Sequence, residues 1–132
     1  MPSFHDSARS AAAPEEVWKL LYDPSRFPDW WAGVGTVDVG IEGEYTMYPD
    51  GYPDFPMPQL LRSDRADGRV SVSCLVSDLR FEWRLEPLGE GEDGTRISVD
   101  VEIPEEEAHR LDTQREAISS SLGKLAELAA SA

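Results

Sequence analysis

The hydrophobic pattern of the chain changes once, at Pro104, and this change limits the possible folds more than any other feature. Between residues 34 and 103, apolar and polar residues alternate with a period of two, which is typical of strands with one dry and one wet face. After Pro104, apolar residues recur at steps of three and four, as in an amphipathic helix. The sequence therefore predicts an antiparallel sheet followed by one long helix.

The alternation predicts a series of strands joined by short turns. The predicted strands cover residues 37–41, 45–47, 60–64, 70–76, 79–85 and 97–103. A looser mixture of apolar and polar residues at 4–11 adds a first strand, so the sheet should have about seven strands. The turns between them, such as Gly40–Gly43 and the loop 89–94, are too short for helical crossovers.

Two short helices are expected after the first strand. Pro14 suits the first turn of a helix that ends near Tyr22, and Asp23 can cap a second one. The long helix should cover about 105–129, which at 1.5 Å per residue is about 37 Å, so it must cross the whole domain. Its apolar stripe needs the sheet as a cover and comprises Ala108, Leu111, Arg115, Ile118, Leu122, Leu125 and Ala129.

The size and charge of the chain exclude several classes of protein. We expect one domain over residues 1–132, a length that supports one core without disulfides. The net charge of −14 repels nucleic acid and anionic membranes. The first residues lack the pattern of a secretory signal, and no apolar run reaches about 20 residues, so we expect a cytoplasmic protein without membrane insertion, as a monomer or homodimer.

The order of the predicted elements, together with Ala12–Leu21 and Phe27–Trp30, resembles the START-like superfamily. This is the polyketide cyclase/dehydrase, SRPBCC or Bet v 1-like group. The resemblance covers nearly the whole chain and implies an α+β helix-grip fold, in which a curved antiparallel sheet wraps around the C-terminal helix. It also implies a cavity between the two, lined by apolar side chains. Members include lipid carriers, aromatase/cyclases and co-chaperones, so the fold does not determine the function.

Inward positions of the strands and of the long helix are the candidate ligand contacts. They are Trp31, Tyr45, Met47, Tyr52, Phe55, Cys74, Phe81, Trp83, Val99, Arg115, Ile118 and Leu122. Cys74 is interpreted as a small apolar filler, because no base lies near it in the sequence. No His or Cys stands at metal-ligand spacing and no phosphate loop is present, so we expect neither metal nor cofactor.

Two features allow two interpretations each. The proline-rich segment 49–58 could be a lid over the cavity mouth, or its Tyr52 and Phe55 could pack on their own domain. Arg115 could anchor a ligand oxygen, or it could lay its stem on the core and carry its charge to the edge.

Three functions remain open on this basis. The leading hypothesis is a binding protein for an apolar or aromatic small molecule, lipid-like or polyketide-like. The second is an aromatase/cyclase-type enzyme, for which Arg115 and Tyr45 are the only catalytic candidates. The third is an interaction module of the co-chaperone type. A closed, dry cavity would favour the binding protein. A deep open cavity in which Arg115 and a tyrosine hydroxyl point at one place would favour the enzyme, and a collapsed cavity with an exposed apolar patch would favour the interaction module.

Overall fold

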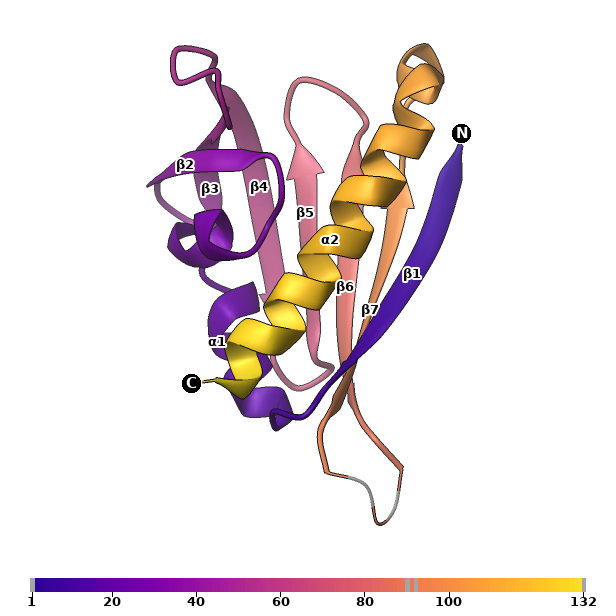
Figure 1. The fold of residues 1–132 in the computed structure, drawn as a ribbon. Helices are drawn as coiled ribbons and strands as arrows, with labels where there is room; N and C mark the ends of the chain where they lie inside the picture. Colours follow the sequence, from indigo (N-terminus) through magenta and orange to yellow (C-terminus); the bar gives the residue numbers. More distant parts are fainter. Residues whose placement is uncertain (1, 90, 92, 132) are drawn as a thin grey trace.

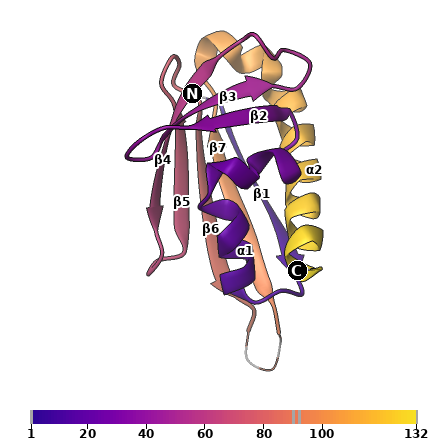
Figure 2. The ribbon, with the colours of Figure 1, turned by 90° about the vertical axis from the view of Figure 1, so that its left-hand side faces the viewer.

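The computed structural model describes residues 2–89, 91 and 93–131. Within these residues, seven strands form one antiparallel sheet, and all helices lie on one face of it (Figures 1 and 2). The strands are β1 (Ser3–Ser10), β2 (Val34–Val39), β3 (Glu44–Pro49), β4 (Met57–Asp64), β5 (Arg69–Cys74), β6 (Arg80–Pro87) and β7 (Thr95–Glu102). The helices are α1 (Pro14–Leu21), the 3₁₀ helices η1 (Pro24–Asp29) and η2 (Glu105–Arg110), and α2 (Leu111–Ala130). The predicted α+β helix-grip fold is confirmed.

The sheet has the order β1-β7-β6-β5-β4-β3-β2, so the two strands that flank α1 and η1 lie at opposite edges. Strands β2 to β7 follow one another as hairpins, and β1 closes the order by pairing with β7, with Phe4 opposite Val101. The segment between β1 and β2 must therefore cross the concave face. This crossing places α1 and η1 in front of the concave face of the sheet (Figure 2).

Local signals explain the two helices of this crossing. Pro14 occupies the first turn of α1, where its missing N–H is not needed, and Glu15 and Glu16 lie at the positive end of the helix dipole. The Asp23 carboxylate accepts a hydrogen bond of 3.0 Å from the Ser25 N–H, as its predicted capping role requires. Four residues of α1 are buried, namely Val17, Trp18, Leu20 and Leu21.

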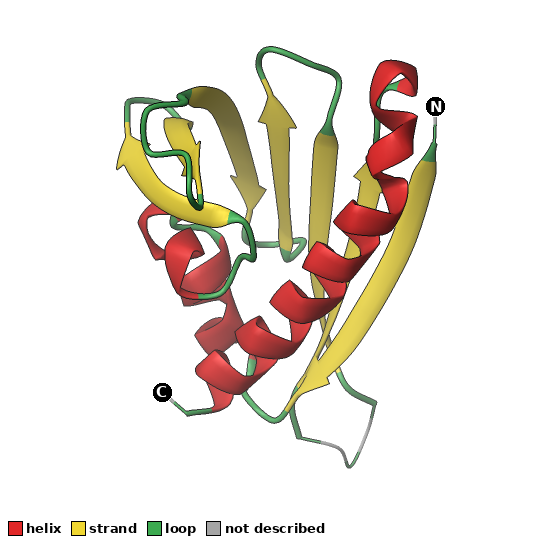
Figure 3. Cartoon of the chain, turned by 45° about the horizontal axis from the view of Figure 1, so that its top comes forward, coloured by secondary structure: helices red, strands yellow, loops and turns green. Residues whose placement is uncertain are grey.

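Helix α2 runs diagonally across the concave face, from the edge at β1 to the end of the sheet that carries α1 (Figure 3). Its buried side chains are Ile118, Ser121, Leu122, Leu125, Ala126 and Ala129. A hydrogen bond of 2.8 Å from the Ser10 hydroxyl to the Ala126 carbonyl ties the end of β1 to the last turns of the helix. The strand, the crossing segment and α2 therefore share one core.

Several boundaries differ from those predicted. The long helix was expected from Glu105, but residues 105–110 form η2, which buries no side chain, and the α-helix starts at Leu111. Without a buried face, packing does not favour α-helical over 3₁₀ geometry there. Strand β4 begins at Met57 instead of Leu60, within the proline-rich segment. The predicted loop 89–94 includes residues 90 and 92, which lie outside the described residues.

The turn between β2 and β3 depends on Gly43. Its φ of +86° favours glycine, and a Cβ atom at this position would overlap the carbonyl oxygen of Leu61. The Gly43 carbonyl in turn accepts a hydrogen bond of 2.8 Å from the Leu61 N–H, so this close approach joins the turn to β4.

We expect Gly43→Ala to lower the free energy of unfolding by about 2 kcal/mol, because it adds both backbone strain and a steric overlap. The control is Gly123→Ala, at an exposed position of α2 where an added Cβ meets no atom within 4 Å. This second change should raise the free energy of unfolding by up to about 1 kcal/mol. Urea denaturation measures both, and equal effects of the two substitutions would contradict the role of Gly43.

Candidate functional site

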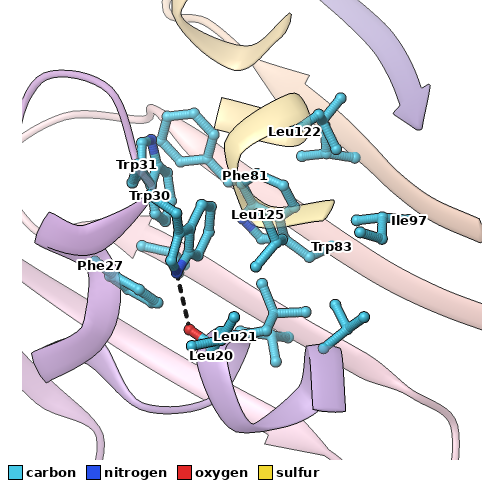
Figure 4. Close-up of a cluster of buried hydrophobic side chains, with 14 of the residues drawn as sticks. Leu20, Leu21, Phe27, Trp30, Trp31, Phe81, Trp83, Ile97, Leu122 and Leu125 are labelled. Atoms are coloured by element: carbon cyan, nitrogen blue, oxygen red, sulfur yellow. Dashed lines mark hydrogen bonds between the residues drawn. The ribbon is translucent and has the colours of Figure 1, made fainter. Parts of the chain in front are cut away.

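Five aromatic side chains gather on the concave face and form the aromatic cluster: Phe27, Trp30, Trp31, Phe81 and Trp83 (Figure 4). The first three come from the crossing segment and the last two from β6. The ring centroids of Trp31 and Phe81 lie 4.9 Å apart, and those of Trp31 and Trp83 lie 5.2 Å apart, both edge to face. The chain thus brings aromatic surface to the sheet from two separate segments.

The orientation of the two adjacent tryptophans is set by polar contacts at either side. The Trp30 indole N–H donates a hydrogen bond of 3.0 Å to the Leu20 carbonyl, at the end of α1 (Figure 4). The Ser121 hydroxyl of α2 accepts a hydrogen bond of 2.8 Å from the Ala32 N–H, directly after Trp31. It donates to the Ala117 carbonyl at 2.6 Å. Ser121 therefore joins the middle of α2 to the segment that carries the tryptophans.

Within the aromatic cluster, Trp83 carries an enclosed indole nitrogen that has no hydrogen-bond partner among the described residues. Its side chain is fully buried, and its indole N–H has no hydrogen-bond partner within the described part of the chain. Most buried donors in proteins find a partner, so an orphaned one calls for an explanation. A bound acceptor atom would satisfy it.

A row of three buried polar side chains lies beside the aromatic cluster, and we call it the polar row: Tyr45 of β3, Gln59 of β4 and Cys74 of β5. Tyr45 is directly opposite Gln59, and Gln59 is directly opposite Cys74. Directly opposite residues of antiparallel strands point to the same face, so the three side chains are neighbours on the concave side. The Phe27 ring lies 5.7 Å from the Tyr45 ring and connects the row to the aromatic cluster.

Burial raises the pKa of the Tyr45 hydroxyl far above its ordinary value, and the neighbouring Cys74 thiol raises it further. The hydroxyl is therefore protonated at any physiological pH. Among the described residues no hydrogen bond to it is found, yet its oxygen is not one of the enclosed atoms that lack a partner, which are Trp83 Nε1 and Arg84 Nε. The hydroxyl can both donate and accept a hydrogen bond, and no contact among the described residues uses either capacity.

The residues named as candidate ligand contacts from the sequence divide into three groups. Buried on the concave side are Trp31, Tyr45, Cys74, Phe81, Trp83, Val99, Ile118 and Leu122. Met47 is half-buried beside them. Tyr52 and Phe55 are 67% and 60% exposed, on the loop between β3 and β4, so they do not pack on the domain. Whether that loop acts as a lid stays a prediction.

Arg115 lies on an exposed part of α2, at the edge of the molecule. Its guanidinium carbon is 5.6 Å from the centroid of the Phe4 ring, a cation–π contact. An open surface groove of about 620 Å³ runs there between β1 and α2, lined by Phe4, His5, Asp6, Arg115, Glu116, Ser119 and Ser120. Tyr45 is on β3, near the other edge of the sheet, so the structure does not bring Arg115 and Tyr45 together.

Sequence reasoning missed Gln59 and Ser121. Gln59 lies two residues before Leu61, whose side chain faces inward. Alternation along the strand therefore predicts that the Gln59 side chain also faces inward. The neighbouring Pro56 and Pro58 concealed this signal, because proline argues against a strand. Ser121 falls on the buried stripe of α2, but its role needs the position of Ala32.

Other classes of site were sought in the described residues. No group of His, Cys, Asp or Glu side chains there is arranged to hold a metal ion. No helix in that part of the chain has the length and hydropathy needed to cross a bilayer.

Comparisons with known proteins identify the family of the chain and agree with its fold. Residues 1–130 match the family model described as polyketide cyclase/dehydrase and lipid transport. No curated protein matches the chain.

Solved structures match closely in fold at low sequence identity. XoxI from Bacillus cereus has 15% identity and a TM-score of 0.77, covering 97% of this chain and 95% of its own. A START superfamily protein from Mycobacterium smegmatis has 13% identity and a TM-score of 0.72, with 96% and 98% covered. The di-domain ARO/CYC BexL of the BE-7585A biosynthetic pathway has 16% identity and a TM-score of 0.77, with 96% of this chain and 46% of BexL covered. At these identities the likeness establishes the fold alone.

The buried Tyr45 hydroxyl should make stability depend on alkaline pH. The folded protein holds this proton more tightly than the unfolded chain does, so stability is unaffected below about pH 10 and falls as pH rises beyond it. Between about pH 8 and about pH 11, Tyr45→Phe should reduce the loss of unfolding free energy by about 1 kcal/mol, measured by urea denaturation. The exposed Tyr52→Phe is the control. The same pH dependence in wild type and Tyr45→Phe would contradict the assignment.

Proposed function

Because the chain belongs to the polyketide cyclase/dehydrase and lipid transport family, we propose that it binds an apolar or aromatic small molecule between the sheet and α2. The observation that carries this proposal is the concave face itself. It combines the aromatic cluster with the enclosed indole N–H of Trp83, which has no partner among the described residues, a composition suited to a ligand and costly for a core that serves packing alone.

The site would use the part of the concave face toward β3 to β5. Helix α2 has its close backbone contacts with β1 and α1, whereas Val37, Met47 and Leu79 are only half-buried at the edge of the core. A planar ligand would stack against the rings of Phe27, Trp31 and Phe81. Burial of its surface would contribute about 25 cal/mol per Å². Tyr52 and Phe55, exposed on the loop above, would cover the ligand and so lose contact with water.

A second candidate is cyclisation of a polyketide-like substrate, favoured by the similarity to the di-domain ARO/CYC BexL. In that case Tyr45 would act as a proton donor, because its raised pKa keeps the hydroxyl protonated. Arg115, at the edge of the molecule, would not take part. Tyr45→Phe would then abolish turnover of a poly-β-ketone mimic while binding persists.

The binding proposal predicts that adding bulk to the concave face blocks a ligand. Met47→Trp should weaken the binding of the neutral fluorophore N-phenyl-1-naphthylamine at least about tenfold, because the indole would occupy the space of the ligand. The matched control is Thr46→Trp, which places the same ring on the opposite face of β3. Fluorescence titration measures both affinities.

Circular dichroism and thermal melting would verify that both variants are folded. Equal affinities in wild type, Met47→Trp and Thr46→Trp would argue against a site on the concave face. Native mass spectrometry of the protein from its own host would then show the mass of any ligand that copurifies with it.

A further inference from the structure

We propose that the outer face of the sheet carries a second binding site, which takes a small phosphate compound such as a pyrophosphate or a phosphate monoester. Four arginines on three adjacent strands form this site, and we call them the arginine cluster: Arg62 of β4, Arg69 of β5, and Arg80 and Arg84 of β6. All described helices lie on the opposite, concave face, so no helix covers the cluster (Figure 2). This inference does not depend on the ligand proposed for the concave face.

The strand register gathers the four side chains around Ser71, in the middle of β5. Arg62 is directly opposite Ser71 on one side, and Glu82 is directly opposite it on the other. The remaining three arginines stand two residues from Ser71 or from Glu82 along their strands, so their side chains project from the same face of the sheet. A hollow of about 230 Å³ opens at this place, and its lining includes Arg62, Asp64, Arg69, Ser71, Arg80 and Glu82.

The arginines of the cluster outnumber the carboxylates that neutralise them. Glu82 serves two of them at once, because its Oε1 atom lies 3.4 Å from the Nη2 atom of Arg84 and 3.8 Å from the Nη1 atom of Arg69. Arg62 and Arg80 are exposed, and neither forms an ion pair within the described part of the chain. Half of the cluster therefore has no counter-charge from the protein.

Two members of the cluster are placed where their charges repel each other. Arg69 is directly opposite Arg84 in the register, an arrangement in which like charges destabilise a sheet. Arg84 also holds an enclosed Nε–H that no acceptor among residues 2–89, 91 and 93–131 satisfies. An anion bound between the strands would reduce the repulsion and would accept hydrogen bonds from guanidinium groups that have donors to spare.

The composition of the chain makes this gathering of unpaired arginines unexpected. The sequence carries 26 acidic and 12 basic side chains, so carboxylates are plentiful. Exposed arginines elsewhere use them: Arg26 pairs with Asp29 at 3.0 Å, and Arg110 pairs with Glu107 at 3.4 Å. An outer face that served only cross-strand ion pairs would place opposite charges opposite each other. The excess of positive charge at the cluster instead suits a ligand that brings negative charge.

The number and type of the donors favour phosphate over carboxylate. Each guanidinium presents a fork of N–H donors that matches phosphate oxygens, and several such forks suit a group with more than one negative charge. The Ser71 hydroxyl, at the centre, adds a further donor. A volume of about 230 Å³ corresponds to roughly eight water molecules at about 30 Å³ each, which is room enough for a pyrophosphate group.

The charge of the rest of the protein limits the size of the ligand. The net charge is −14, so a nucleic acid or an anionic bilayer would be repelled by the acidic surface around the cluster. A small compound places its negative charge within the hollow and meets little of that surface. The phosphate group is therefore expected on a small soluble molecule.

The test is calorimetric titration with pyrophosphate, inorganic phosphate and acetate at low ionic strength, where charges are least screened. Wild type should bind pyrophosphate at least about tenfold more tightly than acetate. The double variant Arg62→Gln/Arg80→Gln should bind pyrophosphate at least about tenfold more weakly than wild type, because it loses the two guanidiniums that have no carboxylate partner.

The control for net charge is the double variant Arg26→Gln/Arg110→Gln, which removes the same two charges at distant exposed positions. It should keep the affinity for pyrophosphate within about twofold of wild type. Glu82→Gln should act in the opposite direction and strengthen pyrophosphate binding at least about threefold, because it releases two guanidiniums and removes a negative charge from the hollow. The matched control Glu107→Gln removes one carboxylate elsewhere and should leave the affinity unchanged.

Vesicles of phosphatidylcholine and phosphatidic acid present the same chemical group on a surface. Wild type should not sediment with them, because of the repulsion between the bilayer and the acidic protein. Sedimentation with the vesicles that is lost in Arg62→Gln/Arg80→Gln would overturn the small soluble ligand in favour of a lipid headgroup.

The remaining outcomes are equally decisive. Absence of pyrophosphate binding by wild type, or equal losses of affinity in the two double variants, would overturn the proposal, and acetate binding as tight as that of pyrophosphate would overturn the phosphate class. Titration with N-phenyl-1-naphthylamine reports on the concave face alone. Its affinity should be the same in wild type and in all arginine variants, so the failure of one site is distinguishable from the failure of the other.

Discussion

The crossing of the concave face by residues 11–33 is the constraint on which the rest of this structure depends. Because β1 and β2 lie at opposite edges of the sheet, the chain between them must pass over its inward side chains. It does so as two short helices, and their ends deliver Phe27, Trp30 and Trp31 to the rings of β6. The aromatic surface is thus a consequence of the topology, since no single segment contains all of it.

Helix α2 completes this core only in part. Ser121 joins its middle to the crossing segment, and Ser10 joins its last turns to β1, both by short hydrogen bonds. Its line of contact runs from β1 to α1, so the region in front of β3 to β5 depends on side chains from η1 for its cover. Among the described residues, the enclosed indole N–H without a partner, that of Trp83, lies on β6, two strands away from the strand β1 that α2 contacts.

Much of the fold could be predicted from the sequence, and the reason is periodicity. Alternation along residues 79–85 and 97–103 identified β6 and β7 and their inward faces, because a half-buried strand has no other pattern. Arg115 shows the limit of the same reasoning. Its spacing placed it on the apolar stripe of the helix, but the helix reaches the edge of the sheet near β1, where Arg115 is exposed and lies against the Phe4 ring. Gln59 was missed because the adjacent prolines disguise the start of β4.

The pairing of β1 with β7 has a consequence for how the chain is made. Strands β2 to β7 can pair with their neighbours as each emerges, but Ser3–Ser10 has no strand to join until Thr95–Glu102 exists. During synthesis the N-terminal strand therefore stays unpaired until most of the protein has left the ribosome. Until then Phe4, Val17 and Leu21, which are buried in the folded protein, are in contact with water or a chaperone. Closure of the sheet at β1 therefore has to follow the synthesis of β7.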